Sequence, residues 1–416
     1  MNTPSRGPQH NEGADTCQGK PCPPNLARRV KRHAWAPAWN WFAVCAPGLE
    51  GPLFQEMRAL GLEPLPAEPD GGGVGFRGKL EAGYLANLWL RCCARVLLRL
   101  ADFRVRTWDD LVRQARAIPW EVFLPAGAPL RVKVSLKGSN LKHSGRVAEE
   151  VLAAAAASLG KIGLAPPGLA ASQEPAQAIM VRGVDRRCQI SLDASGEHLH
   201  KRGYRLAAGK APLREDLAAA LLALAGYDGS QPFLDPMCGA GTLAIEAALL
   251  ARGLPALGEE RDLAMLAWPC HREPTWRHLR EKALAQALAA APQPILARDA
   301  QTSAIKAATA NAQRAGVAAD LAIAKADFFQ TPPPAGPPGL LAMNPPYGKR
   351  LGSVRQAGEF AQRLGAHLAS HYPGWRVAVM LYLPQWLEVL GLRDARTLAA
   401  PFGGLKVTLA VGKVKG

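Results

Sequence analysis

The pattern of apolar and polar residues divides the chain into a front part of mixed elements and a rear part in which strands and helices alternate. Short apolar runs bounded by turn residues are typical of buried strands, whereas longer segments rich in Ala and Leu favour helices. This alternation predicts a doubly wound α/β sheet, in which ligands bind at the carboxyl ends of the strands. The strands predicted for the rear part cover residues 232–235, 294–298, 321–325, 340–343, 375–382 and 405–412.

The front part predicts a smaller α+β region. Residues 130–136 alternate strictly between apolar and polar positions, which predicts a strand with one apolar and one basic face. Residues 80–100 predict a helix on which Arg91, Arg95 and Arg99 share one face, either as a solvated stripe or as a surface for RNA. The remaining predicted elements are strands at 41–45, 74–76, 178–184 and 188–193 and helices at 50–61, 146–158 and 213–225.

Residues 1–38 differ in composition from the rest of the chain. They are rich in Pro, Gly, Asn and Gln and contain a basic run at 28–32. Such a segment has too few apolar residues to form a core, so we predict a disordered arm. A contact with nucleic acid and a solvated tail both explain the basic run.

Charge points to the kind of partner. Among 416 residues there are 50 Lys and Arg against 34 Asp and Glu, which gives a formal net charge of +16. A length of this order predicts about two or three domains, and a hydrophobic fraction of 48% is enough to bury a core. A strongly basic protein most often binds a polyanion, and nucleic acid is the commonest one.

The eight cysteines form no paired CxxC framework, so we expect free thiols and no metal site. Free thiols fit a reducing compartment. No apolar run reaches the length of about 18 residues that a membrane span needs, and the N-terminus lacks the apolar core of a signal peptide. We therefore expect a cytoplasmic protein without a membrane segment.

The first strand of the rear part leads into a glycine-containing turn at 235–242. Gly239 and Gly241 leave room where a ligand approaches the backbone, and Thr242 can cap the following helix. The turn lacks a third glycine and a phosphate-binding lysine, so it is not a dinucleotide fingerprint. Asp235 would repel a pyrophosphate, so the turn favours a cationic or neutral ligand.

Two more carboxylates follow the next two strands. Asp299 ends the second strand, where an acidic residue usually holds ribose hydroxyls, and Asp327 ends the third, where it can accept a hydrogen bond from an adenine amino group. Each carboxylate alone is better explained as a helix cap. Three carboxylates at successive strand ends predict one binding site.

The fourth strand ends in Asn344, Pro345, Pro346 and Tyr347. Two consecutive prolines end both strand and helix, so the chain must leave the sheet there. The amide oxygen of Asn344 and the carbonyl oxygen of Pro345 can accept both hydrogen bonds of a planar NH2 group, and the ring of Tyr347 can stack on the molecule that carries it. An isolated Asn-Pro dipeptide would predict only a turn, but the upstream turn at 235–242 favours a site.

These residues together resemble the S-adenosylmethionine-dependent methyltransferases that act on exocyclic amines of bases. The chain further resembles the THUMP-containing RNA methyltransferases, in particular the bacterial 23S rRNA guanine-N2 methyltransferases of the RlmL type. This resemblance implies a Rossmann-like class I methyltransferase domain at 198–416, preceded by a ferredoxin-like part at 39–82 and a THUMP RNA-binding domain at 83–197. The segments that carry it are 42–50, 199–205, 211–215, 235–242 and 344–348.

The resemblance also implies roles for individual residues, with S-adenosylmethionine as cofactor, ribosomal RNA as partner and no metal. The catalytic residues would be Asn344, Pro345 and Tyr347. The cofactor would contact Asp235, Met237, Cys238, Gly239, Gly241, Thr242, Asp299, Asp327 and Asn344. The RNA would contact Arg131, Lys133, Lys201, Arg202, Arg205 and Arg214, of which the last four lie in a segment rich in basic residues.

Three other functions remain open at the level of sequence. An adenine-N6 methyltransferase acting on RNA or DNA would use the same Asn-Pro-Pro-Tyr motif. A non-catalytic RNA-binding factor would keep the fold without the chemistry, although the intact motifs argue against it. A nicotinamide-dependent dehydrogenase has little support, because the glycine fingerprint of that class is missing.

Overall fold

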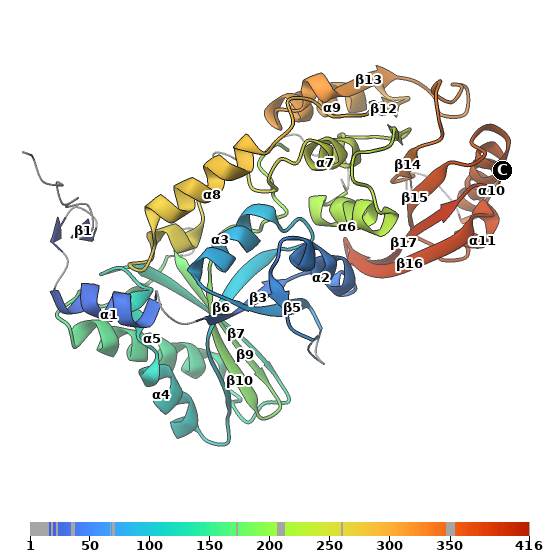
Figure 1. Cartoon of the computed structure of the whole chain (residues 1–416). Helices are drawn as coiled ribbons and strands as arrows, with labels where there is room; N and C mark the ends of the chain where they lie inside the picture. The colour runs from blue at the N-terminus through green and yellow to red at the C-terminus, as the bar shows by residue number, and fades with distance from the viewer. Residues whose placement is uncertain are drawn as a thin grey trace, which may run out of the picture. The chain divides into compact units, whose positions relative to one another are not determined.

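A computed structural model of the chain describes residues 16–17, 20–21, 24–34, 38–66, 68, 71–171, 174–205, 213–258, 261–346 and 354–415 (Figure 1). The chain forms two compact units, each assembled from several segments. The first unit holds Met1–Ala38, Arg99–Asp193 and Ala264–Arg272, and the second holds Trp39–Leu98, Ala194–Leu263 and Glu273–Gly416. Because the units interleave along the sequence, the predicted domain boundaries at 38, 82 and 197 stay predictions.

The second unit contains a seven-stranded sheet with the order β13-β12-β11-β14-β15-β17-β16. Strands β11 to β15 are parallel, and β17 runs antiparallel to both β15 and β16. This sheet confirms the predicted doubly wound architecture. The strands are β11 (Phe233–Asp235), β12 (Ile295–Asp299), β13 (Leu321–Lys325), β14 (Leu340–Met343), β15 (Arg376–Leu381), β16 (Arg393–Phe402) and β17 (Leu405–Lys413).

Helices pack against this sheet through the alternation of its side chains. Leu341 and Met343 of β14 join a buried cluster with Leu364 and Leu368 of α10, since alternate residues of a strand face the same side. Helix α6 packs against β15 and β17, and α7 packs against β11 and β12. The helices are α6 (Glu215–Ala225), α7 (Thr242–Ala251), α8 (Glu273–Ala285), α9 (Thr302–Arg314), α10 (Val354–His371) and α11 (Trp386–Leu390), with a short 3₁₀ turn, η3, at Ala318–Asp320.

The second unit also contains an α+β part formed by β3 (Trp39–Val44), α2 (Glu50–Ala59), β4 (Glu63–Pro64), β5 (Gly73–Gly78), α3 (Leu80–Trp89) and the start of β6 (Arg95–Arg104). Here the prediction of one helix over 80–100 is wrong. Helix α3 ends at Trp89, so Arg91, Arg95 and Arg99 share no helical face. Pairing within the sheet and burial of Val96 and Leu98 outweigh the helical propensity of the segment.

The first unit contains the remainder of β6 in the order β6-β10-β9-β7-β8. Strand β7 runs parallel to β9, and β9 and β10 form an antiparallel hairpin, as the sequence predicted. Leu130 of β7 is buried and Lys133 is exposed, which fits the predicted two-faced strand. The elements are α4 (Trp108–Ala117), η1 (Trp120–Val122), β7 (Pro129–Lys137), α5 (Ser144–Gly160), β8 (Gly168–Leu169), β9 (Gln177–Val184), β10 (Arg187–Asp193) and η2 (Ala264–Ala267).

Part of the arm that we predicted to be disordered is helical. Helix α1 (Pro24–Ala34) buries Leu26 and Val30, and the guanidinium of Arg29 lies 2.5 Å from Glu121 Oε1. The correction has a simple reason, because Leu26 and Val30 are four residues apart and share one helical face. A short antiparallel pair, β1 (Thr16–Cys17) and β2 (Lys20–Pro21), precedes this helix. None of the helices described is both long and apolar enough to cross a membrane.

Candidate functional site

The register of the central strands brings the predicted site residues to one edge of the sheet. In this register Leu234 of β11 is paired with Leu296 of β12 on one side and with Leu341 of β14 on the other. The strands are parallel, so their carboxyl ends lie together. The turn after β11, Asp299 at the end of β12 and Asn344 after β14 therefore share this edge.

The glycine turn has one open position and one packed position. A Cβ atom at Gly239 would meet no atom within 4 Å, whereas a Cβ at Gly241 would lie 3.1 Å from the Cβ of Ala308 on α9. Both glycines have positive φ, +53° and +84°, which favours glycine. Gly239 therefore leaves room for a ligand, and Gly241 instead allows the turn to pack on α9.

Thr242 does not cap helix α7 as predicted. Gly241 occupies the N-cap position, Thr242 is the first helical residue, and no side-chain capping bond forms. The Thr242 hydroxyl instead accepts a long hydrogen bond, 3.4 Å, from the guanidinium of Arg205. Two further predicted cofactor contacts lie in this turn. Met237 packs against the buried cluster that includes α10, and Cys238 is buried with its backbone N–H bonded to the carbonyl of Arg298.

Asp235 lies fully buried at the start of the turn. Its Oδ1 accepts a hydrogen bond from the backbone N–H of Met237 at 3.3 Å. Burial raises the pKa of Asp235 well above its usual value, and the nearby charge of Asp299 raises it further. A carboxyl group in this state is stabilised as an anion when a cation approaches, which suits a positively charged ligand.

Asp299 and Asp327 bind backbone groups of the same edge. Asp299 accepts hydrogen bonds from the N–H of Gly239 at 3.0 Å and of Gln301 at 2.8 Å, so it links β12 to the glycine turn. Asp327 accepts one from the N–H of Phe329 at 2.9 Å. A carboxylate has about four acceptor positions, so both side chains can still accept further hydrogen bonds from a ligand.

Asn344 carries an unsatisfied polar atom into this edge. Its Oδ1 is buried and has no hydrogen-bond partner within the described part of the chain. Buried polar atoms are nearly always paired, so an unpaired acceptor here indicates a place for a donor from a ligand. The next residue, Pro345, is buried, and the predicted stacking residue Tyr347 lies outside the described residues.

The sequence analysis missed Asn311 on α9. Its side chain is fully buried, and its Nδ2 donates a hydrogen bond of 2.9 Å to the carbonyl of Ala240 in the middle of the glycine turn. A signal was present in the sequence, because Asn311 is the polar residue on the helical face that also carries Ala308 and Ala312, both buried. A lone amide on an apolar helical face indicates a specific partner.

Two of the six predicted RNA contacts point inward. Arg202 is 5% exposed and binds Glu246 and the carbonyls of Leu199 and Arg91. Arg205 is held 2.8 Å from Glu215. A buried and paired guanidinium offers no face to a phosphate, so the assignment of Arg202 to RNA binding is wrong, and Arg205 is a weak candidate.

The other four remain accessible to different extents. Lys133 is exposed on β7, and Lys201 is exposed and pairs with Glu197 at 2.8 Å. Arg214 is half-buried and pairs with Asp216. Arg131 donates to the carbonyls of Ala171 and Glu174 from its Nη2 atom, so part of its hydrogen-bonding capacity is used within the protein.

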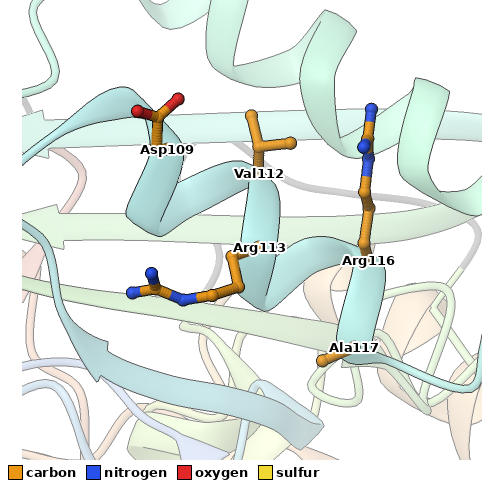
Figure 2. Close-up of a pocket in the computed structure, with 5 residues that line it drawn as sticks. All are labelled: Asp109, Val112, Arg113, Arg116 and Ala117. Atoms are coloured by element: carbon orange, nitrogen blue, oxygen red, sulfur yellow. The ribbon is translucent and has the colours of Figure 1, made fainter.

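A separate hollow lies in the first unit on helix α4 (Figure 2). Every residue that lines it comes from this helix, and Arg113 is engaged by Asp110 at 2.5 Å. The hollow collects neither unsatisfied buried atoms nor carboxylates from several strands, unlike the sheet edge. Its lining residues are Asp109, Val112, Arg113, Arg116 and Ala117.

A sheet of this order, with a glycine turn after β11 and an Asn-Pro-Pro segment after β14, defines a Rossmann-like methyltransferase. Residues 202–410 match the model of the UPF0020 family, described as the RMKL-like methyltransferase domain, and residues 40–97 match the RlmL ferredoxin-like domain. The chain belongs to the UPF0020 methyltransferase family, which confirms the resemblance noted in the sequence. The THUMP assignment stays a prediction.

Individual relatives cover most of the chain. A protein of Synechocystis sp. named "Putative RNA methyltransferase slr0064" is 32% identical over 369 residues, which are 89% of this chain and 95% of that protein. Ribosomal RNA large subunit methyltransferase K/L of Pseudomonas aeruginosa is 35% identical over 91% of this chain, and this chain spans only about half, 53%, of that relative. The structure of SMU.472 in complex with SAH has a TM-score of 0.80 at 27% identity and covers 91% of this chain and 99% of the SMU.472 chain.

Proposed function

We propose that this protein transfers a methyl group from S-adenosylmethionine to the exocyclic N2 amine of a guanine in RNA, with 23S rRNA as the substrate. The unpaired buried Oδ1 of Asn344 carries the proposal, because it is an acceptor placed at the ligand edge with nothing in the described chain to satisfy it. The large-subunit rRNA methyltransferases among the relatives support the choice of RNA.

The protein uses S-adenosylmethionine as its cofactor, and the residues of the sheet edge fit this molecule. The N–H groups of Gly239 and Gly241 are bonded to Asp299 and to the carbonyl of Cys238, so neither is free to bind a phosphate. S-adenosylmethionine has no phosphate and carries a positively charged sulfonium, which suits the carboxylates of Asp235, Asp299 and Asp327. Asp299 would hold the ribose hydroxyls and Asp327 the adenine amine, beside the open position at Gly239.

S-adenosylmethionine, when bound, supplies a methyl group activated by its sulfonium. The chain contributes two acceptors, Asn344 Oδ1 and the carbonyl of Pro345, which would bind the two hydrogens of the target amine. The lone pair of such an amine is delocalised into its ring, and acceptors on both hydrogens hold the nitrogen so that this pair points toward the donor. Much of the rate gain would come from this positioning. Tyr347 would provide the stacking surface for a base removed from its RNA stack.

The exposed cations would supply affinity for RNA. Lys133 and Lys201 are accessible, and contacts of this kind to phosphates do not depend on sequence. Binding should therefore weaken steeply as salt concentration rises. The choice of nucleotide would come from the amine-binding residues at the sheet edge.

Incubation of the full chain with 23S rRNA transcribed in vitro and S-adenosylmethionine tests the proposal. Nucleoside analysis by mass spectrometry should find N2-methylguanosine, and Asn344→Ala should form it about 100-fold more slowly. N6-methyladenosine would instead establish the adenine alternative. A wild-type chain that binds RNA but shows no binding of S-adenosylmethionine by calorimetry would establish the non-catalytic alternative.

A further inference from the structure

Helix α9 contains one side chain that binds the glycine turn, Asn311, and a second, Arg314, that binds Asn311. We propose that Asn311 is a positioning residue for the glycine turn, and that Arg314 and the carbonyl of Tyr204 hold Asn311 in the orientation this requires. The inference rests on the proposed function, because it concerns the affinity for S-adenosylmethionine. Segment 199–205, in which the sequence analysis placed three RNA contacts, would thus help to hold the glycine turn.

The first contact fixes a peptide group of the turn. Asn311 Nδ2 donates to the carbonyl oxygen of Ala240 at 2.9 Å, and Asn311 is fully buried. Ala240 lies between two glycines with positive φ, and glycine has more accessible backbone conformations than other residues because it lacks a Cβ atom. A hydrogen bond to the carbonyl between them selects one orientation of that peptide.

The second contact fixes the amide of Asn311. Its Oδ1 accepts a hydrogen bond of 2.6 Å from Arg314 Nη2, so the amide cannot turn over and present its oxygen to Ala240. Arg314 Nε in turn donates to the carbonyl oxygen of Tyr204 at 2.8 Å. Two of the three guanidinium nitrogen atoms of Arg314 thus link the amide of Asn311 to the backbone at Tyr204.

The anchor at Tyr204 is itself held by buried groups of the same segment. Its hydroxyl lies 3.3 Å from Glu246 Oε1 on α7, and Glu246 also pairs with Arg202. Tyr204 is 5% exposed. The chain of contacts therefore runs from the start of α7, through segment 199–205 and α9, back to the turn that precedes α7.

Loss of the Asn311 bond should act on cofactor binding more than on chemistry. Without it the turn can adopt several peptide orientations, and the apparent Kd rises in inverse proportion to the fraction that can bind. When the buried carbonyl of Ala240 loses its hydrogen bond, the equilibrium between these peptide orientations should shift by a factor of about 10 or more. The reacting amine contacts Asn344 and not this turn, so kcat at saturating S-adenosylmethionine should change little.

The variant Asn311→Leu keeps the branched shape of the side chain and removes both hydrogen bonds. Asn87 is a matched control, since it is also buried, donates to a backbone carbonyl at 2.8 Å (Gly83) and accepts a 2.6 Å hydrogen bond, from Ser195. Arg314→Met is compared with Arg252→Met, because Arg252 also donates to a backbone carbonyl away from the turn, that of Leu288 at 2.9 Å, and in addition pairs with Asp320 at 3.4 Å. The full chain is used throughout, and the readouts are the Kd of S-adenosylmethionine by calorimetry, the melting temperature and kcat on RNA.

We expect Asn311→Leu to raise the Kd of S-adenosylmethionine about 10-fold and Arg314→Met by a smaller factor, with both controls within about twofold of wild type. Asn87→Leu should lower the melting temperature about as much as Asn311→Leu. A Kd for Asn311→Leu equal to that of Asn87→Leu would overturn the inference and leave Asn311 with a role in stability alone. Failure of the wild type to bind S-adenosylmethionine would overturn the proposed function instead, so the two failures are distinguishable.

Discussion

Glu246 on α7 is the carboxylate that two buried arginines share. Its side chain is fully buried and lies 3.5 Å from Arg91 and 3.4 Å from Arg202, and it accepts a hydrogen bond from the hydroxyl of Tyr204. The two guanidiniums are 9% and 2% exposed, so water cannot replace the carboxylate. Burial lowers the pKa of Arg91, and Glu246 is the strongest influence that opposes this effect. The variant Glu246→Gln keeps the shape and removes the charge.

The expected cost follows from this geometry. Removal of one partner from a buried ion pair costs about 3–5 kcal/mol, because an uncompensated charge remains inside the protein. The carboxyl group of Glu56 also interacts with both arginines, so the lower end of this range applies. For a unit of more than 200 residues, such a loss lowers the melting temperature by roughly 5–15 °C.

Thermal unfolding and urea unfolding of the full chain measure this cost. Glu197→Gln is the control, since Glu197 and Lys201 are both 60% exposed and the loss of such a surface pair costs less than about 1 kcal/mol. The triple variant Arg91→Met, Arg202→Met and Glu246→Leu removes all three charges and should recover most of the stability lost by Glu246→Gln. If Glu246→Gln melted within 2 °C of Glu197→Gln, the reasoning that places an uncompensated charge in the core would be refuted.

Three further predictions concern the sheet edge and the segment behind it. Asn344→Ala should lower the single-turnover rate constant of methyl transfer about 100-fold, as expected for a group that acts at the reacting centre. The calorimetric Kd of S-adenosylmethionine should stay within about threefold of wild type, and a rise in Kd as large as the loss in rate would contradict this role. Gly241→Ala should lower the melting temperature more than Gly239→Ala, because its Cβ would lie 3.1 Å from Ala308, whereas Gly239→Ala should mainly weaken cofactor binding. Burial raises the pKa of Glu215 from 4.5 to about 7 despite the nearby Arg205, so its stabilising contribution is present below pH 4.5 and lost as pH rises through 7. Urea unfolding between pH 4.5 and 7 should show that the free energy of unfolding falls with pH in the wild type and falls less in Glu215→Gln.

The sequence predicted most of the second unit's sheet, because buried parallel strands are continuous apolar runs. It missed β16, the outermost strand of the sheet, in which most residues from Arg393 to Ala399 are exposed and show no alternation of apolar and polar residues. It also extended a helix through Arg95, where the structure has the start of β6. In both cases the strand is specified by its neighbours in the sheet, which local sequence does not reveal.

The residues of the candidate site were more predictable than the buried residues that hold them in place. Asp235 and Asn344 each follow an apolar run directly, and only Arg298 separates Asp299 from one, so their place at a strand end can be read from adjacent residues. The partners of Asn311 and Arg202 lie 71 and 44 residues away along the chain, at Ala240 and Glu246. Which polar residue faces which partner depends on how α7 and α9 pack, and no local pattern contains that information.

The burial of the Arg202 side chain does not contradict the inference, drawn from net charge, that the protein binds a polyanion. Arg91, Arg202 and Arg205 pair with only two carboxylates, Glu246 and Glu215, so these buried groups lower the excess of 50 basic over 34 acidic residues by just one charge. That excess must be carried by other side chains. One end of the first unit gathers four that are exposed, where the N–H of Asp185 binds the carbonyl of Lys137 and the N–H of Val105 binds that of Arg186. We therefore expect the proposed RNA contacts at the ends of β6, β7 and the β9–β10 hairpin, where the exposed cations are Arg104, Arg106, Lys137 and Arg186.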